Sequence, residues 1–271
     1  MHRNFHYLSR CNLEEKRTCL FKKERRMNTQ HKNQQFYARV AGLSYIIFTL
    51  AGILDNFILS STLASSEQFL SHGVFANEQH FRWGVLAEIV MFTAVTTASM
   101  GFYLALKPIN KPLMQTALCF RLVEIIIGSF VVTVSMSMLA LSNKTYLLNV
   151  FDAEQIRHII VIASSFRQPA SEYSWIFMGV AGIMTFYLFF KTNYIPKAWS
   201  VWGMFTYSSL IIYPVAKLLI ADLPREAMFV MFPGALFELG VGCWLLIKGL
   251  DFSAYKHELP FKTELSISAE A

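Results

Sequence analysis

Hydrophobic positions in this sequence gather into six long runs that are separated by short polar segments. At about 1.5 Å per residue, a helix of about 20 apolar residues crosses a hydrocarbon core of about 30 Å. Backbone groups in lipid must satisfy their own hydrogen bonds, so helices are expected for such runs. The pattern therefore predicts an all-α, polytopic membrane protein with six transmembrane helices in one bundle. The expected spans are 38–59, 84–106, 113–139, 174–190, 199–221 and 228–247.

The distribution of charge predicts a topology for these spans. Only 15% of the 271 residues are charged, against about 25% in soluble domains. The N-terminal segment through Arg39, the 107–112 and 191–198 turns and the C-terminal tail together hold 17 Lys and Arg residues, and the alternate loops hold 5. Loops rich in Lys and Arg stay on the cytoplasmic side of a membrane. Both termini are therefore predicted to be cytoplasmic.

This topology divides the chain into a basic cytoplasmic tail (1–35), a six-helix transmembrane domain (36–250) and a cytoplasmic C-terminal tail (251–271). Three interpretations of residues 1–26 compete: a tail attracted to anionic lipid, a nucleic-acid arm, or an over-extended start with translation beginning at Met27. The last is favoured, because the residues from Met27 onward read as a short lead into the first helix. The expected partner is the lipid bilayer and not nucleic acid, and the sequence assigns no oligomeric state.

The longest connection is expected outside the cell, from 142 to 173. Within it, residues 151–166 are predicted to form an amphipathic helix. Asp152 is the expected N-cap, and Gln155 completes a capping box. Such a helix either lies on the outer membrane surface or forms a lid over a cavity. Its apolar stripe contains Phe151, Ile156, Ile159, Ile160 and Ala163.

Ionisable residues inside the spans form two groups at different depths. The outer group contains Asp55, Glu88 and Lys217, with Glu172 at the outer mouth. We expect snorkelling or interfacial pairing here, for example between Lys217 and either Asp55 or Glu88.

The deeper group contains Arg121, Glu124 and Glu238. Glu124 and Glu238 lie about 16 Å and about 14 Å from the inner ends of their helices, so both are near the bilayer midplane. In 117–135, 11 Leu, Ile, Val and Phe residues favour insertion by roughly 3 to 7 kcal/mol. Two charges cost about 5 to 7 kcal/mol. This helix therefore needs its charged face to meet protein or water.

Two interpretations of the deep group remain open. Arg121 and Glu124 share a helix face and can pair with each other, which leaves Glu238 to take a proton or a share of Arg121. In one interpretation the three residues are a buried polar staple that fixes the third helix against the sixth. In the other they are a proton-titrating or anion-binding site.

Other chemistry finds no support in the sequence. No His lies in an expected span, which argues against a haem held by two histidines, and His72 and His80 match no zinc spacing. The HExxH, Walker, dinucleotide-glycine and GxSxG motifs are all missing from the sequence. No metal and no cofactor is predicted, and no motif supports an enzyme.

Several motifs along the chain resemble one uncharacterised bacterial membrane family, catalogued as domain of unknown function 4386. The resemblance covers nearly all of 36–250 and excludes residues 1–26. It implies a multi-pass protein of the bacterial inner membrane and supplies no established activity. Arg121 and Glu238 stand where that family typically has Arg and Glu. The motifs, in chain order, are RVAGLSYIIFTLAGI, FRW, LALKPINK, FRLVE, YIPKAWSVWG and FELGVGCWLLIKG.

Three function hypotheses follow. The first is small-solute or proton-linked transport through a polar site between the third and sixth helices. The second is a structural or regulatory membrane protein whose buried charges only specify packing. The third is an intramembrane enzyme with a water-filled pocket that reaches the carboxylates. Transport is the leading hypothesis.

Overall fold

The computed structural model describes residues 3–64, 78–142, 151–220 and 222–253, and every regular element in these segments is a helix. This confirms the all-α class. The elements are α1 (Arg3–Ala64), α3 (Glu78–Leu106), α4 (Lys111–Ser142), α5 (Ala153–Thr192), α6 (Lys197–Leu219), the 3₁₀ helix η2 (Arg225–Met231) and α7 (Phe232–Ile247).

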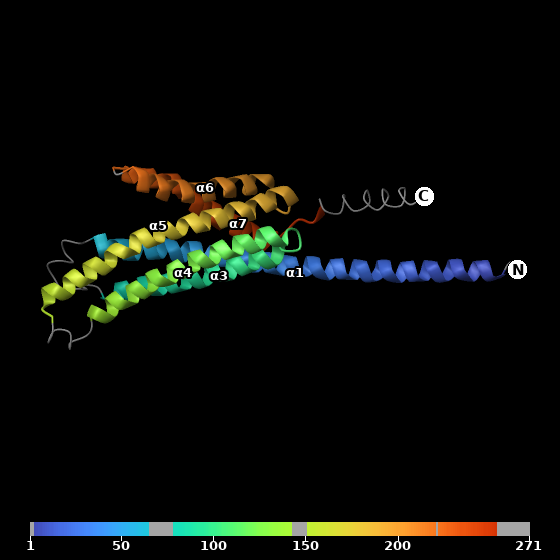
Figure 1. The fold of residues 1–271 in the computed structure, drawn as a ribbon, viewed down its shortest axis with the longest axis horizontal. Helices are drawn as coiled ribbons and strands as arrows, with labels where there is room; N and C mark the ends of the chain where they lie inside the picture. The colour runs from blue at the N-terminus through green and yellow to red at the C-terminus, as the bar shows by residue number, and fades with distance from the viewer. Residues whose placement is uncertain (1–2, 65–77, 143–150, 221, 254–271) are drawn as a thin grey trace.

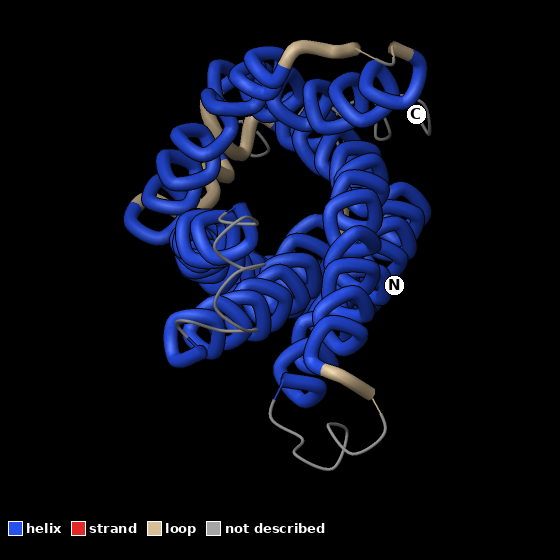
Figure 2. The backbone as a smooth tube through the Cα atoms, turned by 90° about the vertical axis from the view of Figure 1, so that its left-hand side faces the viewer, coloured by secondary structure: helices blue, strands red, loops and turns tan. Residues whose placement is uncertain are grey.

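The long helices form an elongated bundle and run roughly along its long axis (Figure 1). Each packs against its neighbours in chain order: α1 on α3, α3 on α4, α4 on α5, α5 on α6, and α6 on α7. The last helix, α7, also packs against the first, α1. The bundle is therefore a closed ring of six helices, which Figure 2 shows from one end.

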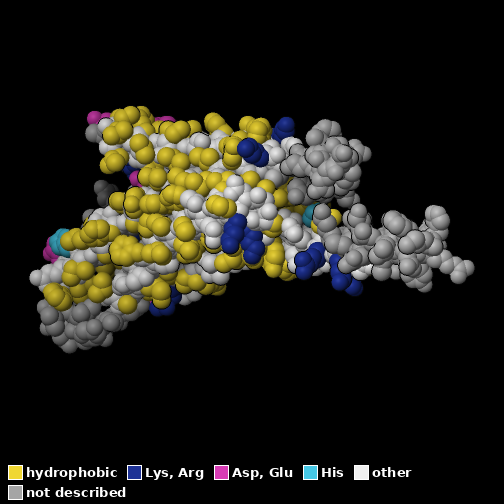
Figure 3. All heavy atoms as spheres, turned by 45° about the vertical axis from the view of Figure 1, so that its right-hand side comes forward, with side chains coloured by type: hydrophobic (Ala, Val, Ile, Leu, Met, Phe, Trp, Pro, Cys, Tyr) yellow, Lys and Arg dark blue, Asp and Glu magenta, His cyan; other side chains and the backbone are white. Residues whose placement is uncertain are grey.

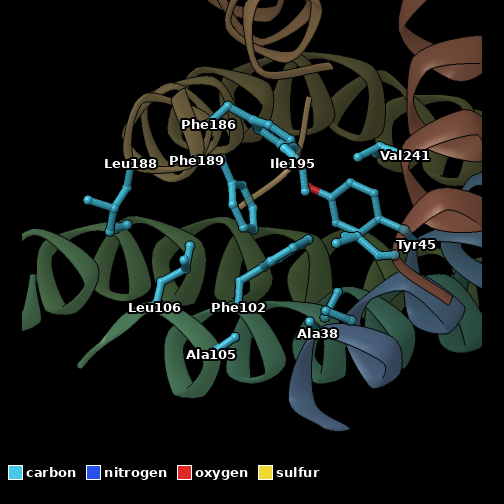
Figure 4. Close-up of a cluster of buried hydrophobic side chains, with 14 of the residues drawn as sticks. Ala38, Tyr45, Phe102, Ala105, Leu106, Phe186, Leu188, Phe189, Ile195 and Val241 are labelled. Atoms are coloured by element: carbon cyan, nitrogen blue, oxygen red, sulfur yellow. The ribbon is translucent and has the colours of Figure 1, made fainter. Parts of the chain in front are cut away.

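Aromatic side chains fill the centre of this ring. Tyr45 of α1 packs edge-to-face on Phe102 of α3, with ring centroids 5.0 Å apart. Phe186 of α5 packs edge-to-face on Phe237 of α7, also at 5.0 Å. Figure 4 shows part of this cluster, with side chains from α1, α3, α5 and α7 pointing toward one another. Edge-to-face pairs at this distance stabilise a core by more than the burial of their surface alone.

Large apolar side chains also cover the outside of the bundle. Phe57, Ile126 and Ile212 are 76%, 68% and 63% exposed. Figure 3 shows such side chains over the middle of one face, with Lys and Arg mostly toward the end where the chain enters and leaves the bundle. A soluble protein rarely exposes an apolar surface of this extent. The outer surface therefore suits contact with lipid.

Five helical segments are long and apolar enough to cross a membrane: Arg25–Ile58, Glu78–Leu106, Lys111–Leu141, Glu154–Thr192 and Glu226–Ile247. Helix α6, which matches the expected fifth span, has 23 residues and is not one of the five. The structure thus has five to six helices suited to a membrane, as expected of a multi-pass membrane protein.

The chain enters and leaves the bundle at the same end, where Gln35 joins α1 to the end of α7. Its amide nitrogen donates to the carbonyl of Lys248 at 3.3 Å, and its amide oxygen accepts from the backbone N–H of Leu250 at 2.8 Å. Gly249 between them has a φ of 71°, which glycine adopts readily and other residues rarely do. This contact ties the start of the bundle to its end.

The expected outer connection differs from the structure. Residues 153–166 are helical, and the capping box at Asp152 and Gln155 is present. However, this helix continues without a break into the expected fourth span and makes α5 40 residues long. Ile156 and Ile160 are buried with Phe81 and other apolar residues in a second core cluster. The segment is therefore an extension of a bundle helix that packs on its neighbours, and not a separate surface helix or lid.

Charge explains why the sequence did not predict this continuity. Arg167 and Glu172 interrupt the hydrophobic run in the middle of α5, so a search for apolar spans begins only after them. Both side chains make ion pairs with other helices. Because their charges are compensated in this way, α5 can continue through these positions as one helix. Helix α1 likewise begins at Arg3, so the segment expected as a tail is a helix continuous with the first span.

Candidate functional site

Arg121 and Glu124 form a buried ion pair on the inner face of α4. The Nη1 atom of Arg121 donates to the two carboxylate oxygens of Glu124 at 2.9 and 3.3 Å. The residues are 8% and 3% exposed. Their spacing of three positions places both side chains on one face of the helix, as the sequence predicts. Each charge is therefore compensated within its own helix.

Glu238 reaches the same region from α7, and its described contacts are hydroxyl groups. Its Oε2 atom lies 3.1 Å from the Oγ1 atom of Thr49 on α1. Its Oε1 atom lies 3.4 Å from the hydroxyl of Tyr207 on α6. Glu238 is 8% exposed. Within the described segments, no ion pair joins Glu238 to a basic residue. This carboxyl group is therefore held by neutral partners.

Tyr207 connects the ion pair on α4 with the carboxyl group on α7. Its hydroxyl lies 2.6 Å from that of Tyr45, and either oxygen can donate. The guanidinium carbon of Arg121 lies 5.7 Å from the centroid of the Tyr207 ring, which is within the range of a cation–π contact. Arg121 and Glu238 thus both contact Tyr207, and Glu124 joins the group through Arg121. The side chains come from α1, α4, α6 and α7.

Sequence reasoning missed the three hydroxyl residues of this site. Tyr45 and Thr49 are four positions apart on α1, and the Oγ1 atom of Thr49 also donates to the carbonyl of Tyr45 at 2.9 Å. That spacing places both side chains on one helix face, so two hydroxyl residues on the inward face of α1 were the available signal. Tyr207 lies in a helix rich in Tyr, Ser and Thr, and no local pattern separates it from the others.

Glycines allow the helices to approach closely around Tyr207. A Cβ atom at Gly182 of α5 would lie 2.2 Å from the Tyr207 ring, and one at Gly203 of α6 would lie 2.6 Å from the Phe186 ring. Phe186 stacks on Tyr207 with ring centroids 5.6 Å apart. The polar site is thus tightly surrounded by rings, and in such low-dielectric surroundings its hydrogen bonds and charges interact strongly.

Two open grooves lie at the end of the bundle where the chain enters and leaves, away from this site. The larger has a volume of about 1110 Å³ and is lined by Lys22, Arg25, Arg26 and Lys107, among others. The second is formed by the turn between α5 and α6 and the end of α7. Neither is lined by Arg121, Glu124 or Glu238.

The outer group differs from the sequence-based expectation. Glu88 of α3 pairs with Arg167 of α5, and Lys217 of α6 pairs with Glu172 of α5. The predicted pairing of Lys217 with Asp55 or Glu88 is therefore wrong. The continuous α5 brings Arg167 and Glu172 between the other helices, where each finds a partner of opposite charge. Asp55 lies close enough to Glu88 and Arg167 for both charges to act on it.

Comparison with protein families matches residues 40–249 to the family described as "Domain of unknown function (DUF4386)". The chain belongs to this family. The matched region contains α3 to α7, the part of α1 from residue 40 onward and every residue of the polar site, and it confirms the resemblance seen in the sequence motifs. Comparisons with curated proteins and with solved structures find no match. The family description carries no activity, so a function must be inferred from the geometry of the site.

Proposed function

We propose that the protein is a proton-linked transporter with six membrane spans, cytoplasmic termini and a location in the bacterial inner membrane, in which Glu238 binds and releases the proton. Ionisable groups inside a helix bundle are costly and commonly mark ion or proton pathways. The location is supported by the family resemblance. The topology is supported by the positive-inside pattern and by the contact of Gln35 with Leu250.

The observation that carries the proposal is a count of hydroxyl protons around Glu238. Thr49 approaches both the Tyr45 carbonyl and Glu238, Tyr207 approaches Glu238, and Tyr45 approaches Tyr207, which makes four contacts. Each hydroxyl group donates only one hydrogen, so three residues supply three protons. A proton on Glu238 supplies the fourth, by donation to Thr49 while Thr49 donates to the Tyr45 carbonyl. The arrangement favours a protonated carboxyl group.

The charges nearby support the same state of Glu238. Arg121 donates to both oxygens of Glu124, so its charge is already paired. A carboxylate at Glu238 would add one uncompensated negative charge to a buried site. A change that weakens the Arg121–Glu124 pair would make the guanidinium available to Glu238 and favour loss of its proton. This coupling gives the site two charge arrangements, as a transport cycle requires.

A proton suits this site better than a larger solute. Phe186 and Phe237 pack on Tyr207, and the described grooves lie elsewhere. A proton can move along hydroxyl groups and a carboxyl group without an open cavity. A solute would need a different arrangement of α5 and α6 around the same residues.

Infrared spectroscopy on the purified protein in lipid vesicles tests the proposal. Protonated carboxyl groups absorb apart from carboxylates, so a titration should show a carboxyl band that Glu238→Gln removes. Glu78→Gln is the matched control, because Glu78 is an outer carboxylate paired with Arg82 four positions away. Vesicles loaded with a pH-sensitive dye should acidify under an imposed pH gradient with wild type and Glu78→Gln, and at least tenfold more slowly with Glu238→Gln.

The alternative is a structural or regulatory protein in which these residues only hold the helices together. It is supported by the number of helices that the site joins, since α1, α4, α6 and α7 each contribute a side chain. In that case Glu238→Gln lowers the thermal midpoint but leaves both the infrared titration and the dye signal at wild-type values. That combination overturns the proton proposal. An intramembrane enzyme has no observation in its favour.

A further inference from the structure

A second buried charge cluster lies between α1, α3 and α5, in the outer half of the bundle. Glu88 is 2% exposed, and its Oε1 atom accepts from Arg167. Its Oε2 atom is also buried, yet it has no hydrogen-bond partner among the described residues. The Nε–H group of Arg167 is likewise buried and has no hydrogen-bond partner among the described residues. Buried polar atoms without partners are rare in folded proteins and mark positions that need an explanation.

Asp55 adds a second carboxyl group to this cluster. It lies on α1, and both Glu88 and Arg167 are close enough for their charges to act on it. Its Oδ1 atom is buried and lacks a hydrogen-bond partner within the described segments. Two carboxyl oxygens from different helices thus remain unpaired beside one guanidinium group.

The charges of this cluster do not balance when both carboxyl groups are ionised. Arg167 compensates one carboxylate, and the ion pair identifies that one as Glu88. Of the other basic residues in the outer half whose side chains the structure describes, Lys217 is paired with Glu172 and Arg82 with Glu78. On the other helices that pack against α1 and α3, the buried charged groups are Glu238 of α7 and the Arg121–Glu124 pair of α4. None of these supplies a positive charge to Asp55, so one negative charge remains.

We propose that Asp55 and Glu88 together hold one exchangeable proton, which makes the outer cluster a second proton-binding site. The proton resides on Asp55, because Arg167 stabilises the carboxylate of Glu88. Protonation changes one oxygen of Asp55 from an acceptor into a donor and removes the uncompensated charge. A metal cation is disfavoured, because the adjacent guanidinium group would repel it.

This site is separate from the one at Glu238. Asp55 lies six residues beyond Thr49 on the same helix, which corresponds to about 9 Å along the axis of α1. Its argument uses different residues and does not require Glu238 to bind a proton. If both sites bind protons, the bundle has two proton-binding sites at different depths, and α1 contributes a residue to each.

Carbodiimide labelling of the wild-type protein in vesicles tests the inference. An apolar carbodiimide adds to protonated carboxyl groups in lipid-like surroundings and leaves a stable N-acylurea, which peptide mass spectrometry assigns to a residue. Labelling of Asp55 should fall at least tenfold from acidic to alkaline buffer. Glu78, at the outer start of α3, is the internal control and should carry little label at any pH, because the adduct of a carboxyl group exposed to water hydrolyses. Absence of a label at Asp55 at every pH overturns the inference.

Two further measurements distinguish a shared proton from other occupants. In Glu88→Gln, Arg167 loses its partner and becomes available to Asp55, so labelling of Asp55 near neutral pH should fall at least fivefold, whereas Glu78→Gln should leave it unchanged. Equal labelling of Asp55 in wild type and in Glu88→Gln would contradict a proton shared between Asp55 and Glu88. Replacement of choline chloride by sodium chloride at constant pH should not protect Asp55, and protection would identify sodium as the occupant instead. The sodium and pH series use wild-type protein, so they decide the matter even if a variant does not fold.

The same digest contains the peptide with Glu238, so the two sites are read independently. Labelling at Asp55 with none at Glu238 would support this inference and count against the proposed function. The opposite pattern would reverse both conclusions.

Discussion

The Oγ1 atom of Thr49 lies 3.1 Å from a carboxylate oxygen of Glu238, although 189 residues separate them in the chain. The contact joins the first helix of the ring to the last. The same hydroxyl group also faces the Tyr45 carbonyl, so a single hydroxyl group takes part in two buried contacts. The hydrogen bonding of the buried site therefore depends on this small side chain.

Thr49→Val should destabilise the protein, because the substitution keeps the shape of the side chain and removes its hydroxyl. A buried carboxyl oxygen without its partner costs about 1–3 kcal/mol. The thermal midpoint of the detergent-solubilised protein should fall accordingly. Thr93→Val is the matched control, since Thr93 also bonds the carbonyl four residues earlier but faces outward from α3. Equal midpoints for the two variants would contradict the role given to Thr49.

Arg121→Met should destabilise the protein more than a double substitution that removes both charges of the pair. Removal of one partner from a buried ion pair leaves an uncompensated charge and costs about 3–5 kcal/mol. Arg121→Met/Glu124→Gln removes both charges and should recover part of that loss. A double-mutant cycle of denaturation midpoints measures the coupling between the two residues. Additive effects would show that the pair contributes little within the bundle.

Gly182→Ala should displace Tyr207 from its place between the helices. The added methyl group would lie 2.2 Å from the ring, and overpacking of this kind costs about 1–3 kcal/mol. The infrared signal of Glu238 should shift as well, because Tyr207 contacts it. Gly52→Ala is the control, since its new atom would meet the flexible end of Met91 at 3.2 Å. An unchanged infrared signal in Gly182→Ala would show that the position of Tyr207 does not affect Glu238.

Asp152→Ala should loosen the first turn of α5. The capping box is lost with the side chain, and loss of an N-cap costs about 1 kcal/mol. Hydrogen exchange of the first turn of α5 should accelerate about fivefold, whereas exchange near Phe186 should not change. Acceleration along the whole of α5 would indicate that the outer extension and the membrane span unfold together.

The sequence predicts the helices and the local ion pair because both depend on near neighbours in the chain. The apolar runs indicate the spans, and the three-residue spacing of Arg121 and Glu124 places them on one face. The long-range contacts were harder to predict. The position of Tyr207 between Arg121 and Glu238 depends on how α6 packs against α5 and α7. Likewise, the partner of Glu88 became apparent only once α5 was seen to continue through Arg167, a residue whose charge suggests a loop.

The closed ring has a consequence for the way the protein is made. Among the helices of the ring, α1 is synthesised before the others, and its neighbour α7 is synthesised after them. Thr49 therefore enters the membrane long before the carboxyl group of Glu238 that it contacts. Assembly can proceed pairwise along the chain from α1 to α6, but the polar site is completed only when the final helix inserts. A chain that stops before α7 would leave the Thr49 hydroxyl group without the carboxyl group of Glu238, so the site closes only when α7 joins the ring.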